Sequence, residues 1–467
     1  MVRLLSVSLA ATLLPLLVVT SDARVHVHAS AATTPSPSPS PSPSAPVTQL
    51  TGQEVGNSII ITNGTLTTCT KKQWTFSQPN APFVSVHFAK FHILKGDVVT
   101  VATPDGSSSK QVTLPAGVVP TQGFSSDRIP GPTAVITFTP NGCLSVNPLP
   151  EEFKLEIDAF EYTYKVAKSS LTNEDREICG AADQNQPAVC FKKAANVSST
   201  VHKKARAVAR LLKSLGAGNP QVACTGFLIG SEGHLMTNNH CIKDAAEANA
   251  TNFEFMVESP TCDVKSCISL GECSQYGKVE SRGAEFLYTN KQYDFTIVKL
   301  RSKPCVVNGK YSFLSLRTKE SKKGETIYIV QHPNGGGKVI TLQQDAKQEG
   351  DDDDDGENDD EDGTDDADKS DKSDGKEDDD DSTKGQLTPT VIAAVNDENN
   401  LGSFWTSYYA DTEGGSSGSP VLSLSDHSVL ALHANGACPN SGAPSNLIVE
   451  DIKKNAKTVK LPADAFA

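Results

Sequence analysis

Two cysteines at the ends of a short β-type segment constrain the local fold of this chain more than any other feature. The apolar run Ala223–Ile229 contains Cys224, and after a turn the second run, His234–Cys241, ends in the pair His240 and Cys241. This pattern predicts a β-hairpin whose ends a Cys224–Cys241 disulfide could join. Such a bridge would hold His240 in a fixed position beside it.

Two further segments carry residues with catalytic potential. Asp294 is a lone carboxylate at the start of the alternating run Phe295–Leu300, which reads as a strand. Ser417 lies in the Gly/Ser-rich segment Thr412–Pro420, directly before another apolar strand. Glycines permit positive φ angles and leave room for a substrate carbonyl, so a serine set among them can be presented beside N–H groups that bind an oxyanion.

Each of these residues also has a purely structural interpretation. His240 could be a buried structural histidine, Asp294 the cap of a strand, and the Gly/Ser segment an ordinary turn. Their order along the chain, His then Asp then Ser, is that of the chymotrypsin-type triad. The joint occurrence of the three in suitable local contexts favours catalysis, and we predict His240, Asp294 and Ser417 as catalytic residues.

The first residues have the composition of an export signal. Residues 1–23 begin with a basic start, continue as a short apolar core and end in small residues, which is typical of a secretory signal peptide rather than a membrane span. We therefore expect a secreted, extracellular protein without a membrane segment in its mature form, in a compartment where disulfides persist. Sequons at Asn63, Asn196 and Asn249 predict a glycoprotein.

The net charge of −14 comes from one segment. Between Asp351 and Asp381 there are 20 Asp and Glu residues and 3 Lys, a local balance of −17, which leaves +3 for the rest. No basic stripe suggests nucleic acid. We expect residues 346–386 to be a disordered insertion in the loop of a strand pair. A calcium-binding loop is the alternative, but the run lacks a regular ladder of ligands with its glycine.

The remaining chain divides by composition. Residues 24–46 form a Pro/Ser-rich linker that favours polyproline II. Residues 47–166 contain short β-type runs separated by turn signals, which predicts a small β-sandwich with Cys69 and Cys143 available for one bridge. Its stretch Phe88–Asp97 looks like part of a CUB-type module. Its histidines lack accompanying carboxylates or cysteines, so they are not expected to bind a metal.

Residues 167–467 carry the catalytic segments. A helix is predicted over Ser199–Leu215, where apolar residues recur at helical spacing before Gly216. The rest is predicted as strands. Without the acidic insertion this part is long enough for two six-stranded barrels with a cleft between them. The expected fold class is all-β, a two-barrel domain preceded by the β-sandwich.

Five segments together resemble the lysyl endopeptidase branch of the trypsin-like, chymotrypsin-fold serine proteases. They are Ala223–Cys241, Tyr293–Thr296, Ile327–Asn334, Thr412–Pro420, and Leu432–His433 followed by Cys438. The resemblance covers roughly residues 179–450 and includes neither the sandwich nor the acidic insertion. It implies a serine endopeptidase that acts on proteins or peptides and needs no metal or organic cofactor.

The resemblance also implies a role for each site residue. Ser417 is expected to be the nucleophile, His240 the general base and then acid, and Asp294 the carboxylate that orients the histidine. The backbone N–H groups of Gly415 and Ser417 would form the oxyanion hole. A protease-like binding or inhibitory protein with an impaired site is the main alternative. An esterase with the same acyl-transfer chemistry is another, although the residue order disfavours an α/β-hydrolase.

Disulfide pairing and substrate selection follow from the same resemblance. It implies the bridges Cys224–Cys241, Cys179–Cys438 and Cys190–Cys262, and leaves Cys267, Cys273 and Cys305, for which one pair and one free thiol is the simplest outcome. Lysyl endopeptidases read a basic side chain with an aspartate, and the matching residue here is Asn446. A neutral amide cannot neutralise a buried lysine, so we expect lysine selectivity to be lost or weakened. His433 could contact an acidic or polar substrate side chain, or only pack on the pocket.

Overall fold

The computed structural model describes residues 52–115, 118–119, 123–164, 178–179, 183–192, 199–263, 267, 277–345, 387–395, 404–456 and 458–467. The expected signal peptide, the Pro/Ser linker, the body of the acidic insertion and the sequon at Asn196 lie outside these residues. Within the described part of the chain, no helix is both long enough and apolar enough to cross a membrane.

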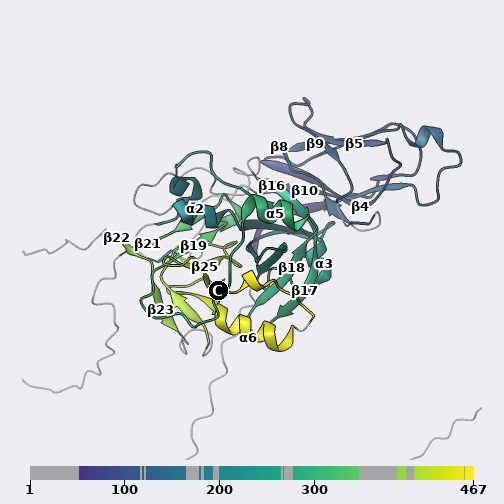
Figure 1. The fold of residues 1–467 in the computed structure, drawn as a ribbon. Coiled ribbons are helices and arrows are strands. Elements are labelled where there is room, and N and C mark those ends of the chain that lie inside the picture. The colour runs from purple at the N-terminus through teal and green to yellow at the C-terminus, as the bar shows by residue number, and fades with distance from the viewer. Residues whose placement is uncertain are drawn as a thin grey trace, which may run out of the picture. The chain divides into compact units, whose positions relative to one another are not determined.

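Residues 52–164 form the strands of two sheets, drawn in purple to blue in Figure 1. Every second side chain of β5 (Val98–Ala102) and β9 (Thr133–Thr139) is buried. These side chains belong to one hydrophobic core between the two sheets, which also includes Phe88 and Phe138. One sheet has the order β3 (Lys72–Ser77), β9, β5 and β6 (Ser109–Val112). The other contains β1 (Gln53–Ile60), β2 (Thr65–Leu66), β4 (Phe83–His92), β7 (Phe124–Ser125), β8 (Ile129–Pro130) and β10 (Lys154–Thr163).

The following part of the chain forms the antiparallel strands of the first barrel. They are β12 (Val208–Ser214), β13 (Gln221–Ile229), β14 (His234–Thr237), β15 (Thr251–Phe255), β16 (Lys278–Arg282), β17 (Ala284–Asn290) and β18 (Phe295–Leu300). The predicted hairpin is β13–β14, in which Phe227 pairs with Met236. Nearly every residue of β13, β14 and β18 is buried, so this hairpin is a rigid support for the residues at its ends.

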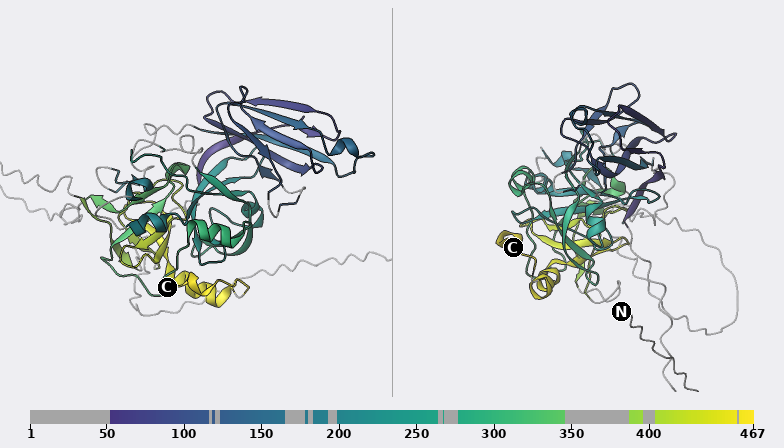
Figure 2. Two further views of the ribbon diagram at one scale, coloured as in Figure 1. Left: turned by 45° about the horizontal axis from the view of Figure 1, so that its top comes forward. Right: turned by 90° about the vertical axis from the view of Figure 1, so that its right-hand side faces the viewer.

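A second sheet supplies the other barrel, and Figure 2 shows it in green to yellow. Its order is β11 (Gln186–Pro187), β20 (Val339–Thr341), β19 (Ile327–Gln331), β25 (Pro420–Ser423), β26 (Val429–Asn435), β27 (Asn440–Pro444), β24 (Thr406–Tyr408) and β23 (Ile392–Val395). The fold is therefore all-β and chymotrypsin-like, which confirms the predicted fold class. Helix α6 (Ser445–Asn455) follows β27 directly.

The strand β1 belongs to both halves of the described chain. Its second half pairs with β10 of the sandwich, where Gly56 faces Thr163. Its first half pairs antiparallel with β13 of the first barrel, where Gln53 faces Ala223. One continuous sheet of thirteen strands therefore runs from the sandwich into the barrel. The sequence analysis did not predict this connection, because strand pairing between distant segments has no local signal.

The predicted helix over Ser199–Leu215 is wrong beyond its first turns. Helix α2 spans Ser199–Ala205, and the chain then enters strand β12 (Val208–Ser214). β12 lies between β13 and β15 and hydrogen-bonds to both, and almost its whole length is buried. Its apolar residues do not alternate with polar ones, because both faces of the strand are buried, so they also match a helical period. Pairing on both edges decides in favour of the strand.

Two further features of the chain's organisation are a hairpin at the acidic insertion and a set of disulfides. Strands β21 (Gln343–Asp345) and β22 (Leu387–Pro389) pair, with Asp345 opposite Leu387, so the acidic insertion starts and ends at the tip of a hairpin. Four disulfides between described cysteines join the pairs given above: Cys69–Cys143, Cys179–Cys438, Cys190–Cys262 and Cys224–Cys241. Cys267 is also disulfide-bonded, and Cys273 lies outside the described residues.

Candidate active site

His240 and Asp294 are brought together by the pairing of β14 with β18. Thr237, at the end of β14, faces Thr296 near the start of β18, so the residues that follow one strand and precede the other are neighbours. The Asp294 carboxylate accepts from the His240 backbone N–H at 2.9 Å through Oδ1, and its Oδ2 lies 2.6 Å from His240 Nδ1. Two contacts on one carboxylate fix both the backbone and the ring of the histidine.

The other ring nitrogen of His240, Nε2, has no hydrogen-bond partner among the described residues. His240 is 6% exposed, and its Nε2 makes no hydrogen bond with any group in the described part of the chain. The Ser417 hydroxyl therefore makes no hydrogen bond to this nitrogen in the described structure. In a site without substrate, such a contact is often long and closes only in the reacting complex.

Backbone contacts place Ser417 between the two barrels. The N–H of Thr225, on β13, donates to the Ser417 carbonyl at 2.8 Å, and the N–H of Gly418 donates to the carbonyl of His433, on β26, at 2.9 Å. Cys241 Sγ lies 3.8 Å from the Ser417 carbonyl oxygen. Since Cys241 follows His240 directly, these contacts set the serine loop against the histidine loop. Ser417 itself is only half-buried, so a substrate can reach it.

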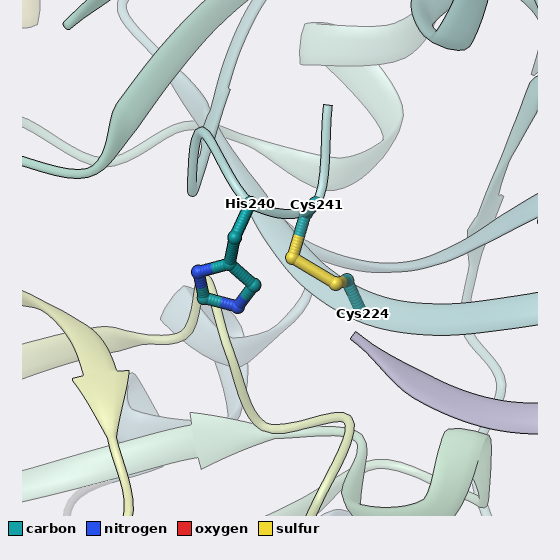
Figure 3. Close-up of side chains that lie close together, drawn as sticks. All are labelled: Cys224, His240 and Cys241. Carbon is teal, nitrogen blue, oxygen red and sulfur yellow. A yellow bond between two sulfur atoms is a disulfide. The ribbon is translucent and has the colours of Figure 1, made fainter. Parts of the chain in front are cut away.

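Cys224, His240 and Cys241 form a close group, and Figure 3 shows that the imidazole lies beside the disulfide. Their ligand-type atoms lie within 4.8 Å of one another, a spacing that would suit a metal ion. The two sulfur atoms are bonded to each other at 1.96 Å. A disulfide has no thiolate to offer, so this group is the bridge predicted from the sequence and not a metal site.

The peptide groups around Gly415 are held in one orientation. The carbonyl of Gly414 accepts from the Asn334 N–H at 2.6 Å, and the carbonyl of Gly415 accepts from Thr225 Oγ1 at 2.9 Å. In a trans peptide the C=O and N–H point in opposite directions, so the Gly415 N–H is directed away from Asn334. Gly415 has φ +94°, which glycine adopts without strain.

The N–H groups predicted for the oxyanion hole are available as donors. Neither the Gly415 nor the Ser417 N–H donates to another group within the residues that the structure describes. Both N–H groups lie in or next to a tight turn that is closed by a hydrogen bond from the Ser416 N–H to the Glu413 carbonyl at 2.9 Å. Unsatisfied donors on a fixed turn are what stabilisation of an oxyanion requires.

Sequence reasoning missed the residues that support this turn. Asn334, in the 3₁₀ turn η4 (Pro333–Gly335), has φ +53°, and its Nδ2 donates to Glu413 Oε2 at 2.6 Å. Arg210, fully buried on β12, donates through Nη1 to the carbonyl of Gly335 at 2.7 Å. Asn334 belonged to the segments that carried the family resemblance, but nothing in the sequence indicated a contact with Gly414.

His433 is a buried, neutral residue of β26. It is 1% exposed, and its Nδ1 lies 2.9 Å from the hydroxyl of Tyr408 on β24. Burial, with a smaller contribution from the charge on His240, lowers the pKa of His433 to about 3. The side chain therefore carries no charge near neutral pH.

Asn446 is not among the residues that pair with the end of β26. It occupies the first turn of α6, whereas the strand register sets Gly442 opposite His433 and Ser441 opposite Asn435. Asn446 itself takes no part in this pairing. The buried carboxylate before the serine loop belongs to Asp411, and it accepts from the N–H groups of Cys179 at 2.8 Å and Gln184 at 2.6 Å.

Several known proteins are similar to this chain. A model of the trypsin-like peptidase domain matches residues 224–432. "Secreted RxLR effector protein 73" of Plasmopara viticola is 32% identical over 374 residues, which is 80% of this chain and 79% of that protein.

Among solved structures, the HtrA-type protease AlgW with a tripeptide is 13% identical with a TM-score of 0.34, over 55% of this chain and 62% of that one. A serine endoprotease from Yersinia pestis is 11% identical with a TM-score of 0.32, over 54% of this chain and 64% of that one. The chain thus spans less than two thirds of either protease. It belongs to the family of the secreted RxLR effector protein 73, and its residues 224–432 match the trypsin-like peptidase domain of serine proteases.

Proposed function

We propose that this protein is a secreted serine endopeptidase that hydrolyses peptide bonds through an acyl-Ser417 intermediate. One observation carries the proposal. Asp294 holds the His240 backbone N–H at 2.9 Å and its Nδ1 at 2.6 Å, while Nε2 has no partner among the described residues. This arrangement leaves the imidazole one task, which is to exchange a proton with a group on the side of Ser417.

The reaction follows from these positions. His240 Nε2 takes the proton of Ser417 Oγ as the oxygen attacks the substrate carbonyl. The N–H groups of Gly415 and Ser417 donate to the oxyanion that forms. His240 then gives the proton to the leaving amine, the C–N bond breaks, and a water molecule activated by His240 releases the acyl group from Ser417. Asp294 stays ionised and stabilises the imidazolium in both steps.

The charges of the site support selection of a substrate side chain other than lysine. Both oxygens of the Asp411 carboxylate accept backbone N–H groups, His433 is neutral, and the residue matched to the lysine-reading aspartate is Asn446. None of these three residues thereby offers a free carboxylate to a basic side chain. We assign to His433 a contact with an uncharged or acidic side chain at the residue before the scissile bond. The substrate backbone would pair with the strand around His433–Asn435.

Secretion rests on a separate set of observations. Residues 1–23 have the pattern of a signal peptide, four disulfides join described cysteines, and the relative from Plasmopara viticola is named as a secreted protein. Asn63 is exposed and offers a site for glycosylation. Expression in a eukaryotic host, followed by N-terminal sequencing of the medium fraction, tests both the export and the position of signal cleavage.

Covalent labelling tests the catalytic proposal directly. A fluorophosphonate should modify the purified wild type, and Ser417→Ala should abolish the adduct. Ser281→Ala, which removes a buried hydroxyl on β16 of the first barrel, is the matched control and should retain it. A folded wild-type protein that forms no adduct would contradict the enzyme and favour the alternative, a protease-like binding or inhibitory protein.

A further inference from the structure

The edge of β13 next to the candidate active site is occupied by a strand of the same chain. Ala223 on β13 pairs with Leu212 of β12 on one side and with Gln53 of β1 on the other. A peptide can add to a sheet only where a strand has an open edge. At Ala223 both edges are taken, so no substrate can pair there while β1 is in place.

The first residues of β1 lie directly against the catalytic loops. A Cβ placed on Gly52 would come within 2.7 Å of Cys224 Sγ, in the disulfide beside His240. A side chain at Gly414, the residue before Gly415, would collide with Oε1 of Gln53. The purple strand that approaches Cys224 in Figure 3 is β1. Gly52 and Gln53 thus span the space from the disulfide to the oxyanion turn.

The chemistry of the proposed reaction says which part of a substrate needs this space. His240 must deliver a proton to the leaving amine, so the residues after the scissile bond depart on the His240 side of Ser417. That side is bordered by the Cys224–Cys241 bridge and continues along β13 toward Ala223. β1 runs antiparallel to β13 there, as a departing peptide would, and therefore stands where that peptide would pair.

Packing keeps this half of β1 in place. Val55 is fully buried in a cluster with Leu212 and Ala223, and its carbonyl accepts from the Tyr164 N–H at 2.9 Å. Tyr164 also donates its hydroxyl to Glu54 Oε1 at 2.9 Å. The pairing is thus anchored on both the barrel and the end of the sandwich.

We propose that β1 limits the substrates of this protein from within the chain, by occupying the leaving-group side of the site. Substrates with a small leaving group are hydrolysed, whereas peptides that extend for several residues past the scissile bond are excluded unless residues 53–56 detach from β13. This inference rests on the proposed function and narrows it.

Two fluorogenic substrates with the same acyl-side peptide test the proposal on the full-length secreted protein. One carries a coumarin amide as leaving group, and the other is an internally quenched peptide with four residues after the scissile bond. Wild type should hydrolyse the amide and prefer it over the extended peptide. Val55→Glu should raise kcat/KM for the extended peptide about tenfold or more and change it little for the amide.

Matched variants separate this effect from damage to the fold. Ile60→Glu places the same charge at an exposed end of the same strand, where Ile60 is 62% exposed, and should behave as wild type. Glu54 pairs with Val222, and its side chain is exposed. Glu54→Pro should disturb this pairing without placing a charge in the core. It therefore tests the proposal even if Val55→Glu does not fold.

The outcomes distinguish this inference from the proposed function. If wild type hydrolyses the amide and the extended peptide equally well, or if both β1 variants leave the ratio unchanged, the inference is overturned and the peptidase proposal stands. If no variant hydrolyses the amide and Ser417 does not react with fluorophosphonate, the proposed function has failed and this inference fails with it.

Discussion

The Asp294 carboxylate contacts His240 twice, at 2.9 Å on the backbone N–H and at 2.6 Å on the ring Nδ1. The first contact fixes the His240 loop. The second favours the tautomer that carries its proton on Nδ1 and leaves Nε2 unprotonated. Asp294 adopts φ +46°, in the left-handed region. Few residues other than glycine adopt this conformation, although asparagine and aspartate do so more often than most. This backbone conformation has an energetic cost, and the contacts that position the imidazole hold Asp294 in it.

Replacing Asp294 by Asn should therefore abolish most activity without unfolding the protein. An amide can donate to Nδ1 and stabilise the wrong tautomer, and the loss in comparable triads is roughly 10⁴-fold in kcat. Steady-state hydrolysis of a fluorogenic amide measures it. Asp105→Asn, on an exposed turn of the sandwich, is the control and should not change kcat. A variant at position 294 that kept a tenth of the wild-type rate would contradict the role given to this carboxylate.

Thr225→Val tests whether the oxyanion turn is held by its neighbours. Thr225 Oγ1 donates to the Gly415 carbonyl at 2.9 Å and accepts from the His332 N–H at 3.1 Å. Valine keeps the shape and removes both contacts, so the peptide between Gly415 and Ser416 should lose its fixed orientation within the oxyanion turn. We expect kcat to fall by about 10- to 100-fold with little change in KM, since the contact acts on the transition state.

A buried threonine far from the site supplies the control. Thr251 is 1% exposed and donates through Oγ1 to the Glu247 carbonyl at 2.8 Å. Thr251→Val removes a comparable hydrogen bond and should lower the melting temperature without lowering kcat. Equal losses of kcat in the two variants would show that stability, and not the orientation of the peptide after Gly415, determines the effect.

Sequence patterns predicted the parts of this molecule that depend on neighbouring residues. The β13–β14 hairpin, the strand after Asp294 and the hairpin that carries the acidic insertion all show local alternation or a local turn. The proximity of His240 to Asp294 follows from one strand pair, and the resemblance to a known family supplied the rest of that arrangement.

Contacts between distant segments were not accessible in this way. Strand β12 read as a helix because a run buried on both faces has no distinctive period. The pairing of Gln53 with Ala223 joins residues far apart in the chain, and nothing around Gln53 marks it. Likewise, the contact of Arg210 with the Gly335 carbonyl depends on how two barrels meet, which no local pattern encodes.

Acid should destabilise the fold through His433. Its folded pKa of about 3 lies below the ordinary 6.5, so the unfolded chain binds a proton in this range and the folded chain does not. The stability is complete above pH 6.5 and is lost as the pH falls toward 3, by roughly 1.4 kcal/mol per pH unit. His433→Asn should therefore show a shallower loss of stability with falling pH.

Denaturant unfolding of wild type and variant between pH 5 and 6.5 measures this difference, because most carboxylates do not titrate there. His332 is a second buried histidine, and burial first, then the charges of Lys338 and Arg210, lower its pKa well below 6.5. His332 therefore still makes the free energy of unfolding depend on pH in the His433→Asn variant. Parallel curves for wild type and His433→Asn would contradict the assignment.

We expect no preference for lysine at the residue before the scissile bond, and hydrolysis of matched peptides tests this. Both oxygens of the Asp411 carboxylate accept backbone N–H groups, and His433 is neutral, so a lysine before the scissile bond finds no opposite charge at either residue. Matched coumarin amides that differ only in that residue should give a kcat/KM for lysine no higher than for glutamine or leucine, because an uncompensated buried charge is costly. Cleavage confined to lysine would contradict this reading of the pocket.

The buried pair of Arg210 and Glu254 should be the most sensitive charged contact in the barrel. Arg210 Nε donates to Glu254 Oε2 at 3.0 Å, and Arg128 of the sandwich donates to the other carboxylate oxygen. Burial by itself would raise the pKa of Glu254, but the charges of Arg128 and Arg210 outweigh it and hold that pKa below its ordinary value. The pair is therefore ionised on both sides.

Glu254→Gln leaves the fully buried Arg210 guanidinium without its counter-charge, and we expect a loss of about 3–5 kcal/mol in the free energy of unfolding. Replacing both Arg210 and Glu254 by Met should cost less than Glu254→Gln alone, since the fully buried guanidinium is removed and only the partly exposed Arg128 loses its counter-charge. Glu156→Gln, at the partly exposed ion pairs with Lys90 and Lys154, should change stability by less than about 1 kcal/mol. Denaturant titration compares the three, and a Glu254→Gln protein as stable as Glu156→Gln would show that the buried charges are solvated in another way.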